Sequence, residues 1–354
     1  MDKIFKIDGR EVGMGKPAYI IAEMSANHHH DLNRAMAIVD AAAKSGANAI
    51  KLQTYRADTL TLDAGNDCFK IGEGTRWAGR RLYALYDEAH TPWEWQPLIR
   101  QRARQLGMGC FSSPFDLSSI DFLESHNFPA YKIASFEIVD LGLIKAATKT
   151  GKPIIISTGM ATIDEVNEAV KTVQQAGGTQ LALLKCTSAY PATAQTMNLS
   201  VISDLQHRFQ IPIGLSDHSM GETVPATAVA MGACIIEKHF TLSRQDAGPD
   251  SGFSLEPNEF KAMVDAVRHT ESAMGDIQYG PSDNEIPSLK FRRSLFATED
   301  IEAGEVFTSH NVRSIRPADG LHPRYLADVL GKSAIKKINR ATPLDWSLIH
   351  KDAE

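Results

Sequence analysis

The sequence predicts an α/β fold, a closed (β/α)8 TIM barrel followed by a small C-terminal domain. Three observations predict the barrel. Eight short apolar runs alternate with amphipathic helical stretches up to about residue 275. The stretches between the runs are long enough to cross back over a sheet, which indicates parallel βαβ units. An open dinucleotide-binding sheet would require a glycine-rich turn after its first strand, and no such turn follows the first apolar run here.

The expected elements follow in chain order. The β-rich apolar runs predict strands at Tyr19–Ala22, Ala49–Gln53, Gly109–Ser112, Ala130–Ile133, Ile154–Ser157, Leu181–Lys185, Ile213–Leu215 and Ile235–His239. Helical periodicity predicts helices that include Leu32–Lys44, Trp93–Leu106, Leu117–Ser125, Ile163–Gln175, Val224–Met231 and a last helix near Glu256–Met274. A long insertion, Arg56–Thr91, separates the second strand from its helix, and loops of this length are commonly functional lids or carry helices.

The pattern changes after residue 275. Residues 276–290 are polar and contain glycine and proline, which predicts a linker between a catalytic barrel at 1–275 and a small domain at 291–354. At about 60 residues such a domain is marginally stable alone, so we expect it to dock on another surface.

Composition narrows the class of protein. The chain has 354 residues, 43% hydrophobic and 23% charged, which is typical of a globular protein. No apolar run has the length of a membrane helix and no secretory signal is visible, so we expect a cytoplasmic protein without membrane contact. The net charge of −6 argues against a nucleic-acid surface but leaves room for an anionic small molecule in a local pocket.

Polar residues gather at the predicted carboxyl ends of the strands, where barrel enzymes place their reactive groups. Lys51 and Lys132, with the hydroxyls of Ser113, Ser135 and Ser157, would form a donor-rich patch for a phosphate or carboxylate. The alternative is that each lysine extends its ammonium group to solvent. Further polar residues at these ends are Gln53, Ser188, Tyr190, Ser216 and Asp250.

Two histidines and two glutamates complete the predicted site. His218 and His239 end consecutive strands, so their imidazoles could share one divalent ion; the alternative is hydrogen-bonded core histidines. Glu23 and Glu237 suit proton transfer, or else form structural ion pairs with Lys51 or Lys238.

Ordered motifs at these strand ends carry a family resemblance. The strings are IAEMSANH, KLQTY, YKIAS, ISTGMAT, KCTSAYP, GLSDHS, EKHFTL and GPDSGFSLEP. Together they resemble the sialic acid synthase family, and the string RRSLFATEDIEAGEVFTSHNVRSIRP resembles its antifreeze-like (SAF) domain. The resemblance implies a transferase that condenses phosphoenolpyruvate with an amino-sugar aldehyde, giving a nine-carbon 2-keto acid and phosphate.

The resemblance also assigns roles to individual residues. It implies phosphoenolpyruvate binding by Lys51, Ser113, Lys132, Ser135, Ser157 and Ser216. It implies sugar binding by Gln53, Ser188, Tyr190, Asp250 and Arg316, and catalytic roles for Glu23 and Glu237. His218 and His239 would bind Mn²⁺ or Mg²⁺. Arg316 matches an arginine that one subunit lends to its partner, which implies a homodimer with exchanged C-terminal domains.

The choice of sugar rests on small departures. Relatives that use N-acetylmannosamine typically carry Asn where this chain has Ser188, and this favours 2,4-diacetamido-2,4,6-trideoxy-altrose, which would give pseudaminic acid. The alternatives are an N-acetylneuraminate or legionaminate synthase using another hexosamine, a metal-dependent pyruvate aldolase, and a sugar-binding protein without catalysis. The aldolase would not need the anion patch at Lys51 and Lys132.

Overall fold

The computed structural model describes residues 1–246 and 248–350. The chain divides into two compact units, Met1–Gly275 and Asp276–Glu354. In the first unit eight parallel strands close into a barrel in the order β10-β3-β4-β5-β6-β7-β8-β9, so the predicted (β/α)8 fold is confirmed. The strands are β3 (Tyr19–Glu23), β4 (Ala49–Thr54), β5 (Gly109–Pro114), β6 (Tyr131–Ile133), β7 (Ile154–Ser157), β8 (Leu181–Cys186), β9 (Ile213–Asp217) and β10 (Ile235–His239).

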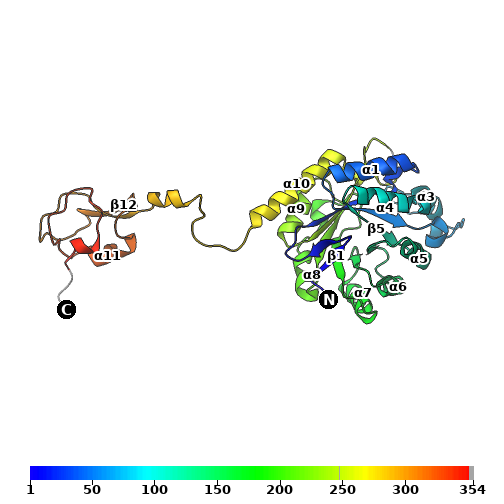
Figure 1. Cartoon of the computed structure of the whole chain (residues 1–354), viewed down its shortest axis with the longest axis horizontal. Helices are drawn as coiled ribbons and strands as arrows, with labels where there is room; N and C mark the ends of the chain where they lie inside the picture. The colour runs from blue at the N-terminus through cyan, green and yellow to red at the C-terminus, as the bar shows by residue number, and fades with distance from the viewer. Residues whose placement is uncertain (247, 351–354) are drawn as a thin grey trace. The chain divides into compact units, whose positions relative to one another are not determined.

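Helices cover the outside of these strands (Figure 1). They are α1 (Leu32–Lys44), α4 (Gln96–Gln105), α5 (Leu117–Ser125), α6 (Leu141–Lys149), α7 (Ile163–Gln175), α8 (Val201–Phe209), α9 (Thr223–Ala230) and α10 (Pro257–Met274). Short 3₁₀ helices are η1 (Ser25–His28), η3 (Trp93–Trp95), η4 (Ala194–Thr196) and η5 (Ser251–Phe253). Side chains cap the amino-terminal ends of two of these helices. Asp31 caps α1 by accepting a hydrogen bond from the backbone N–H of Asn33, and Thr162 and Glu165 form a capping box at the start of α7.

A hairpin that the sequence did not predict closes one end of the barrel. Its strands are β1 (Ile4–Ile7) and β2 (Arg10–Gly13). Buried Phe5 and Ile7 belong to the same apolar cluster as Tyr19, which begins β3, and Phe111 inside the barrel. The hairpin therefore packs apolar side chains against the amino-terminal end of the barrel interior.

The insertion after β4 carries helices of its own, α2 (Ala57–Leu60), η2 (Asp67–Phe69) and α3 (Leu82–Ala89). A second apolar cluster lies between the strands and the outer helices, and it holds the barrel together. Among the helices of the described residues, none has the length and hydropathy needed to cross a bilayer.

The second unit has its own hydrophobic core, which includes Leu295, Phe307, Val312, Val329 and Leu344. Its elements are η6 (Ile286–Phe291), β11 (Ser294–Ala297), β12 (Val312–Ile315), η7 (Pro323–Tyr325), α11 (Leu326–Val329) and η8 (Trp346–Leu348). The strands β11 and β12 pair antiparallel. The linker boundary at residue 290 stays a prediction.

Candidate active site

Four charged side chains meet at the carboxyl end of the barrel. Lys51 on β4 pairs in register with Glu23, the last residue of β3, and the two side chains form an ion pair. The Oε1 atom of Glu237 lies 3.6 Å from Nζ of Lys51 and 3.4 Å from Nζ of Lys132. All four side chains are buried. Sequence reasoning placed these residues at one end of the barrel, and the structure brings them into one cluster.

The environment separates the two carboxyl groups. Burial raises the pKa of Glu23, and neither Lys51 nor Lys132 compensates fully. Burial would also raise the pKa of Glu237, but the positive charges of Lys132 and Lys51 outweigh it and hold that pKa below its ordinary value. Glu237 is therefore the more persistent anion, and Glu23 takes up a proton more readily.

Hydroxyl groups surround the charged cluster. Ser113 Oγ accepts a hydrogen bond from Lys51 Nζ at 3.2 Å, and Ser216 Oγ donates to Glu237 Oε1 at 3.5 Å. The hydroxyls of Ser135 and Ser188 lie 2.8 Å apart. Ser157 Oγ is buried and has no hydrogen-bond partner among the described residues. An oxyanion in this region would therefore meet both ammonium groups and hydroxyl donors.

His218, directly after β9, and His239, the last residue of β10, lie side by side with their rings tilted by 54° and the ring centroids 5.3 Å apart. Nδ1 of His218 donates to the carbonyl oxygen of Thr187 at 2.9 Å, which leaves Nε2 as its free nitrogen. Burial holds the pKa of His239 well below its ordinary value, so this imidazole is neutral. Its Nδ1 atom is buried without a hydrogen-bond partner in the part of the chain that the structure describes.

An ion pair behind the histidines joins their two strands. Lys238 on β10 pairs with Asp217 on β9, Nζ to Oδ2 at 2.7 Å, and both side chains are fully buried. Asp217 also accepts from the backbone N–H of Ser219 at 2.8 Å. Of the two ion pairs that were the alternative for the glutamates, the pairing with Lys51 is therefore present, whereas neither glutamate pairs with Lys238 among the described residues. Lys238 instead donates to the carbonyl oxygen of Ser219 and fixes the backbone beside His218.

A cavity of about 420 Å³ lies above the cluster. Five predicted site residues line it: Gln53, Ser135, Tyr190, His239 and Asp250. The insertion supplies much of the opposite wall through Leu60, Ile71, Thr75, Trp77, Leu82, Leu85, Tyr86 and Ala89. Trp77 is fixed there, because its indole N–H donates to the carbonyl oxygen of Pro249 at 3.1 Å. The insertion is thus a wall of the site.

Asp250 is held on the rim of this cavity by its neighbours. Its carboxylate accepts hydrogen bonds from the hydroxyl of Ser25 and from the backbone N–H of Ala26, the latter at 3.4 Å. Burial raises the pKa of Asp250. The backbone N–H of Ser25 also donates to Glu23 Oε1 at 3.0 Å, so one short turn after β3 orients two of the predicted site residues.

A buried acidic residue of the cavity escaped the sequence reasoning. Glu137 lies in the loop after β6, and its Oε2 atom is buried with no hydrogen-bond partner among the described residues. Burial raises its pKa to about 7. Its position two residues after Ser135, in the string YKIASFE, was the available signal.

Arg316 belongs to the second unit, directly after β12, and its role at this site stays a prediction.

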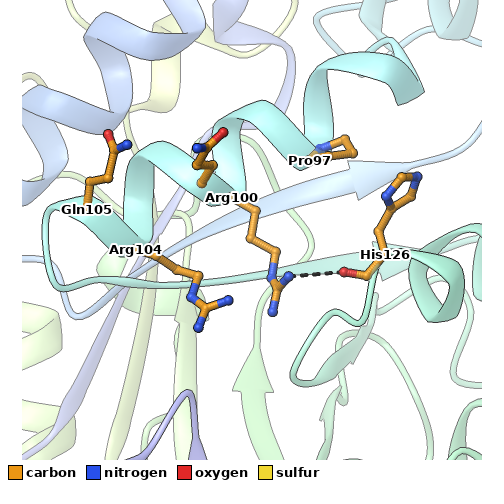
Figure 2. Close-up of a pocket in the computed structure, with 6 residues that line it drawn as sticks. Pro97, Arg100, Arg104, Gln105 and His126 are labelled. Atoms are coloured by element: carbon orange, nitrogen blue, oxygen red, sulfur yellow. Dashed lines mark hydrogen bonds between the residues drawn. The ribbon is translucent and has the colours of Figure 1, made fainter.

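A hollow on the outer face of α4 has a different character (Figure 2). It measures about 410 Å³ and is lined by Arg100, Arg104 and His126 among others. Arg100 donates there to the carbonyl oxygen of His126 at 3.0 Å. None of the predicted site residues lines it, and it lies outside the barrel rather than at the strand ends, so the candidate site is the cavity at the barrel mouth.

A (β/α)8 barrel with buried lysines, carboxylates and hydroxyls beneath a cavity at the ends of its strands is typical of enzymes that act on small anionic substrates. The family model described as NeuB family matches residues 38–279, and the model described as SAF domain matches residues 292–349. The chain therefore belongs to the NeuB family and carries a C-terminal SAF domain, as the resemblance implied.

Curated relatives match over most of the chain. A pseudaminic acid synthase of Campylobacter jejuni is 46% identical over 323 residues, 91% of this chain and 94% of the relative. A pseudaminic acid synthase of Helicobacter pylori is 43% identical over 332 residues, 94% of this chain and 97% of the relative. The solved N-acetylneuraminic acid synthetase of Leptospira borgpetersenii, in complex with citrate, has 32% identity and a TM-score of 0.71, covering 82% of this chain and 96% of its own.

Proposed function

We propose that this enzyme condenses phosphoenolpyruvate with 2,4-diacetamido-2,4,6-trideoxy-altrose and water to give pseudaminic acid and phosphate. The observation that carries the reaction is the buried cluster of Lys51 and Lys132 with its hydroxyls, directly beneath the cavity at the barrel mouth. The likeness to two pseudaminic acid synthases supports the choice of sugar.

Phosphoenolpyruvate would bind in the floor of the site. Its carboxylate and phosphate need cationic and hydroxyl donors, and these are what Lys51, Lys132, Ser113, Ser135, Ser157 and Ser216 offer. The unpartnered hydroxyl of Ser157 supports this placement, since a buried donor without an acceptor is costly. A pyruvate aldolase would have no use for a phosphate cradle of this size.

The sugar would occupy the cavity above. Gln53, Tyr190 and Asp250 line it, and Ser188 lies at its edge beside Ser135. A volume of about 420 Å³ suits a hexose with two acetamido groups.

His218 and His239 would hold Mn²⁺ or Mg²⁺ at the aldehyde end. The residues fit such an ion. Nδ1 of His239 is buried without a hydrogen-bond partner among the described residues, and Nε2 of His218 is free because its Nδ1 donates a hydrogen bond to a backbone carbonyl. No third His, Cys, Asp or Glu joins them among the described residues, so water and substrate oxygens would complete the coordination. When bound, the ion would act as a Lewis acid toward the aldehyde.

The chemistry follows from the positions of these groups. Carbon 3 of phosphoenolpyruvate attacks the aldehyde carbon, a C–C bond forms, and the aldehyde oxygen takes up a proton. Positive charge develops at carbon 2, where the persistent anion Glu237 stabilises it. Water adds at carbon 2 and gives up a proton to Glu23, whose raised pKa suits it as a base. The bond between carbon 2 and the phosphate oxygen then breaks, and the carbon-2 hydroxyl passes its proton to the departing phosphate as it becomes the keto group. The proton that water gave to Glu23 balances the one that the aldehyde oxygen took up.

Arg316 would reach this site from a partner subunit. The SAF domain that contains Arg316 has a hydrophobic core of its own, and the polar residues 276–290 join it to the barrel. An exchanged domain would bring the guanidinium group to an acetamido carbonyl or to water in the sugar cavity. This arrangement requires a homodimer.

A substrate panel tests the proposal. Purified enzyme is supplied with Mn²⁺, phosphoenolpyruvate and one of three sugars: the diacetamido-altrose, its legionaminic-type isomer, or N-acetylmannosamine. Phosphate release is measured for each. We expect the highest kcat/KM with the diacetamido-altrose. A higher value with either other sugar would identify a legionaminate or N-acetylneuraminate synthase, and sugar cleavage without phosphate dependence would identify an aldolase.

A further inference from the structure

The mouth of the barrel has two chemically different halves. In the strand order, β10 and β6 are four places apart in a ring of eight, so they lie opposite each other. The half around β10 carries the polar groups of His218, His239 and Asp250, with the rings of Tyr190 and Phe253 packed against the histidines. The half above β4 to β6 is apolar and aromatic: Tyr55 and Phe115 follow β4 and β5 with rings 5.1 Å apart.

The insertion completes this apolar half. Leu82, Leu85 and Tyr86 of α3 line the cavity, and the ring of Tyr86 lies 5.9 Å from that of Tyr55. A sugar with hydroxyl groups at every position gains little from such a wall. A deoxy sugar with acetyl groups presents several methyl groups, and burial of their surface against this apolar wall is favourable.

Glu137 is the charged exception in this half. It follows β6, lines the cavity, and its Oε2 atom is buried without a hydrogen-bond partner among the described residues. The phenol pKa of Tyr86 is raised mainly by burial and also by the charge of Glu137, so the two side chains are close enough to interact. A buried acceptor left unpaired is unfavourable, so this site discriminates against a ligand that cannot donate a hydrogen bond to it.

We propose that Glu137 and Tyr86 position the acetamido group at carbon 4 of the sugar, Oε2 of Glu137 accepting from the amide N–H and the Tyr86 hydroxyl donating to the acetyl carbonyl. The direction of the sugar supports this. If the aldehyde carbon of the sugar lies at the histidines beside β10, the rest of the sugar's carbon chain extends across the mouth of the barrel toward β6. This inference rests on the proposed function and adds two residues that set its specificity.

The test uses full-length Glu137→Leu, Glu137→Gln and Tyr86→Phe, with Glu168→Gln as the matched control, because Glu168 is an exposed glutamate on α7. We expect Glu137→Leu to raise the KM of the diacetamido sugar at least tenfold, with the KM of phosphoenolpyruvate changed less than twofold. Glu137→Gln keeps an acceptor oxygen and should recover most of this loss. Circular dichroism checks that each variant is folded.

A pair of inhibitors locates the contact on the sugar. The alditol of the diacetamido sugar and its counterpart with a hydroxyl at carbon 4 are compared by their inhibition constants. We expect the wild type to prefer the diacetamido alditol, and Glu137→Leu and Tyr86→Phe each to reduce this preference severalfold. An unchanged ratio in Glu137→Leu overturns the assignment, even where the wild type releases phosphate normally. Absence of phosphate release by the wild type with every sugar refutes the proposed function instead.

Discussion

Lys132 and Glu237 meet across the interior of the barrel, with Nζ of the lysine 3.4 Å from Oε1 of the glutamate. They belong to β6 and β10, which lie on opposite sides of the ring of strands. The contact therefore ties together two halves that are more than one hundred residues apart in sequence. It also explains why the pKa of Glu237 lies low despite complete burial of the carboxylate.

Replacing Lys132 should weaken phosphoenolpyruvate binding more than sugar binding. Lys132→Met removes a charge-assisted contact of about 1.5–3 kcal/mol, so the KM of phosphoenolpyruvate should rise at least tenfold. The pKa of Glu237 should rise as well, since Lys132 contributes to lowering it, and the acid limb of the pH–rate profile should move to higher pH. Lys171→Met, at an exposed lysine of α7, is the control. A larger effect on the KM of the sugar would contradict the assignment of Lys132.

His239→Ala should abolish metal-dependent turnover while the barrel stays folded. We expect kcat/KM to fall on the order of a hundredfold or more, and the affinity for Mn²⁺, measured by calorimetry, to fall with it. His207→Gln, at an exposed histidine of α8, should leave both quantities unchanged. Unchanged metal affinity in His239→Ala would exclude His239 as a ligand.

Breaking the ion pair behind the histidines should destabilise the barrel. Lys238→Met leaves Asp217 charged and buried, at a cost of about 3–5 kcal/mol in the free energy of unfolding. The double variant Lys238→Met/Asp217→Leu should recover much of this loss. Lys261→Met breaks a pair of similar length between exposed partners on α10 and should change urea unfolding little. Equal effects of the two lysine substitutions would mean that burial of the pair is unimportant.

The stability of the enzyme should depend on pH through Glu137. Its pKa is about 7 when folded against an ordinary value of 4.5, so between these pH values the folded state binds more protons than the unfolded state. Stability from this group is therefore present at low pH and is lost as the pH rises toward 7. Glu137→Gln should therefore gain stability over the wild type at pH 8, where the wild-type carboxylate is charged, and gain little at pH 5. The difference between the two gains, measured from melting temperatures, should correspond to at most about 3 kcal/mol. A melting difference that is the same at both pH values would show that Glu137 is not perturbed.

Complementation tests the exchanged domain. Arg316→Ala should raise the KM of the sugar, and mixing it with Glu23→Gln should restore activity in roughly a quarter of the sites through hybrid dimers. A mixture of His239→Ala with Glu23→Gln should stay inactive, because both changes fall in the barrel and no hybrid site is intact. If native mass spectrometry shows hybrids of the first mixture without restored activity, Arg316 does not act in the partner's site.

The order of elements and the set of polar residues at the strand ends follow from local sequence. Each strand is a short apolar run, and parallel strands joined by helices all end on the same side, so Lys51, Lys132, His218 and His239 could be assigned to one end without coordinates. The hairpin β1–β2 was missed because its eight strand residues alternate too briefly to be distinguished from a loop. Glu137 was missed for another reason, since an acidic residue in a loop is ordinarily solvated.

What the sequence determined by itself was therefore the barrel, its reactive rim and the family. Closure of the ring decided the rest: that Glu237 faces Lys132 rather than its neighbour Lys238, that Lys238 joins Asp217, and that residues 56–91 form one wall of the cavity. The reason is that contacts across a barrel depend on how many strands close it and how they are staggered. No local pattern of side chains specifies these quantities, and only the packing of the whole domain fixes them.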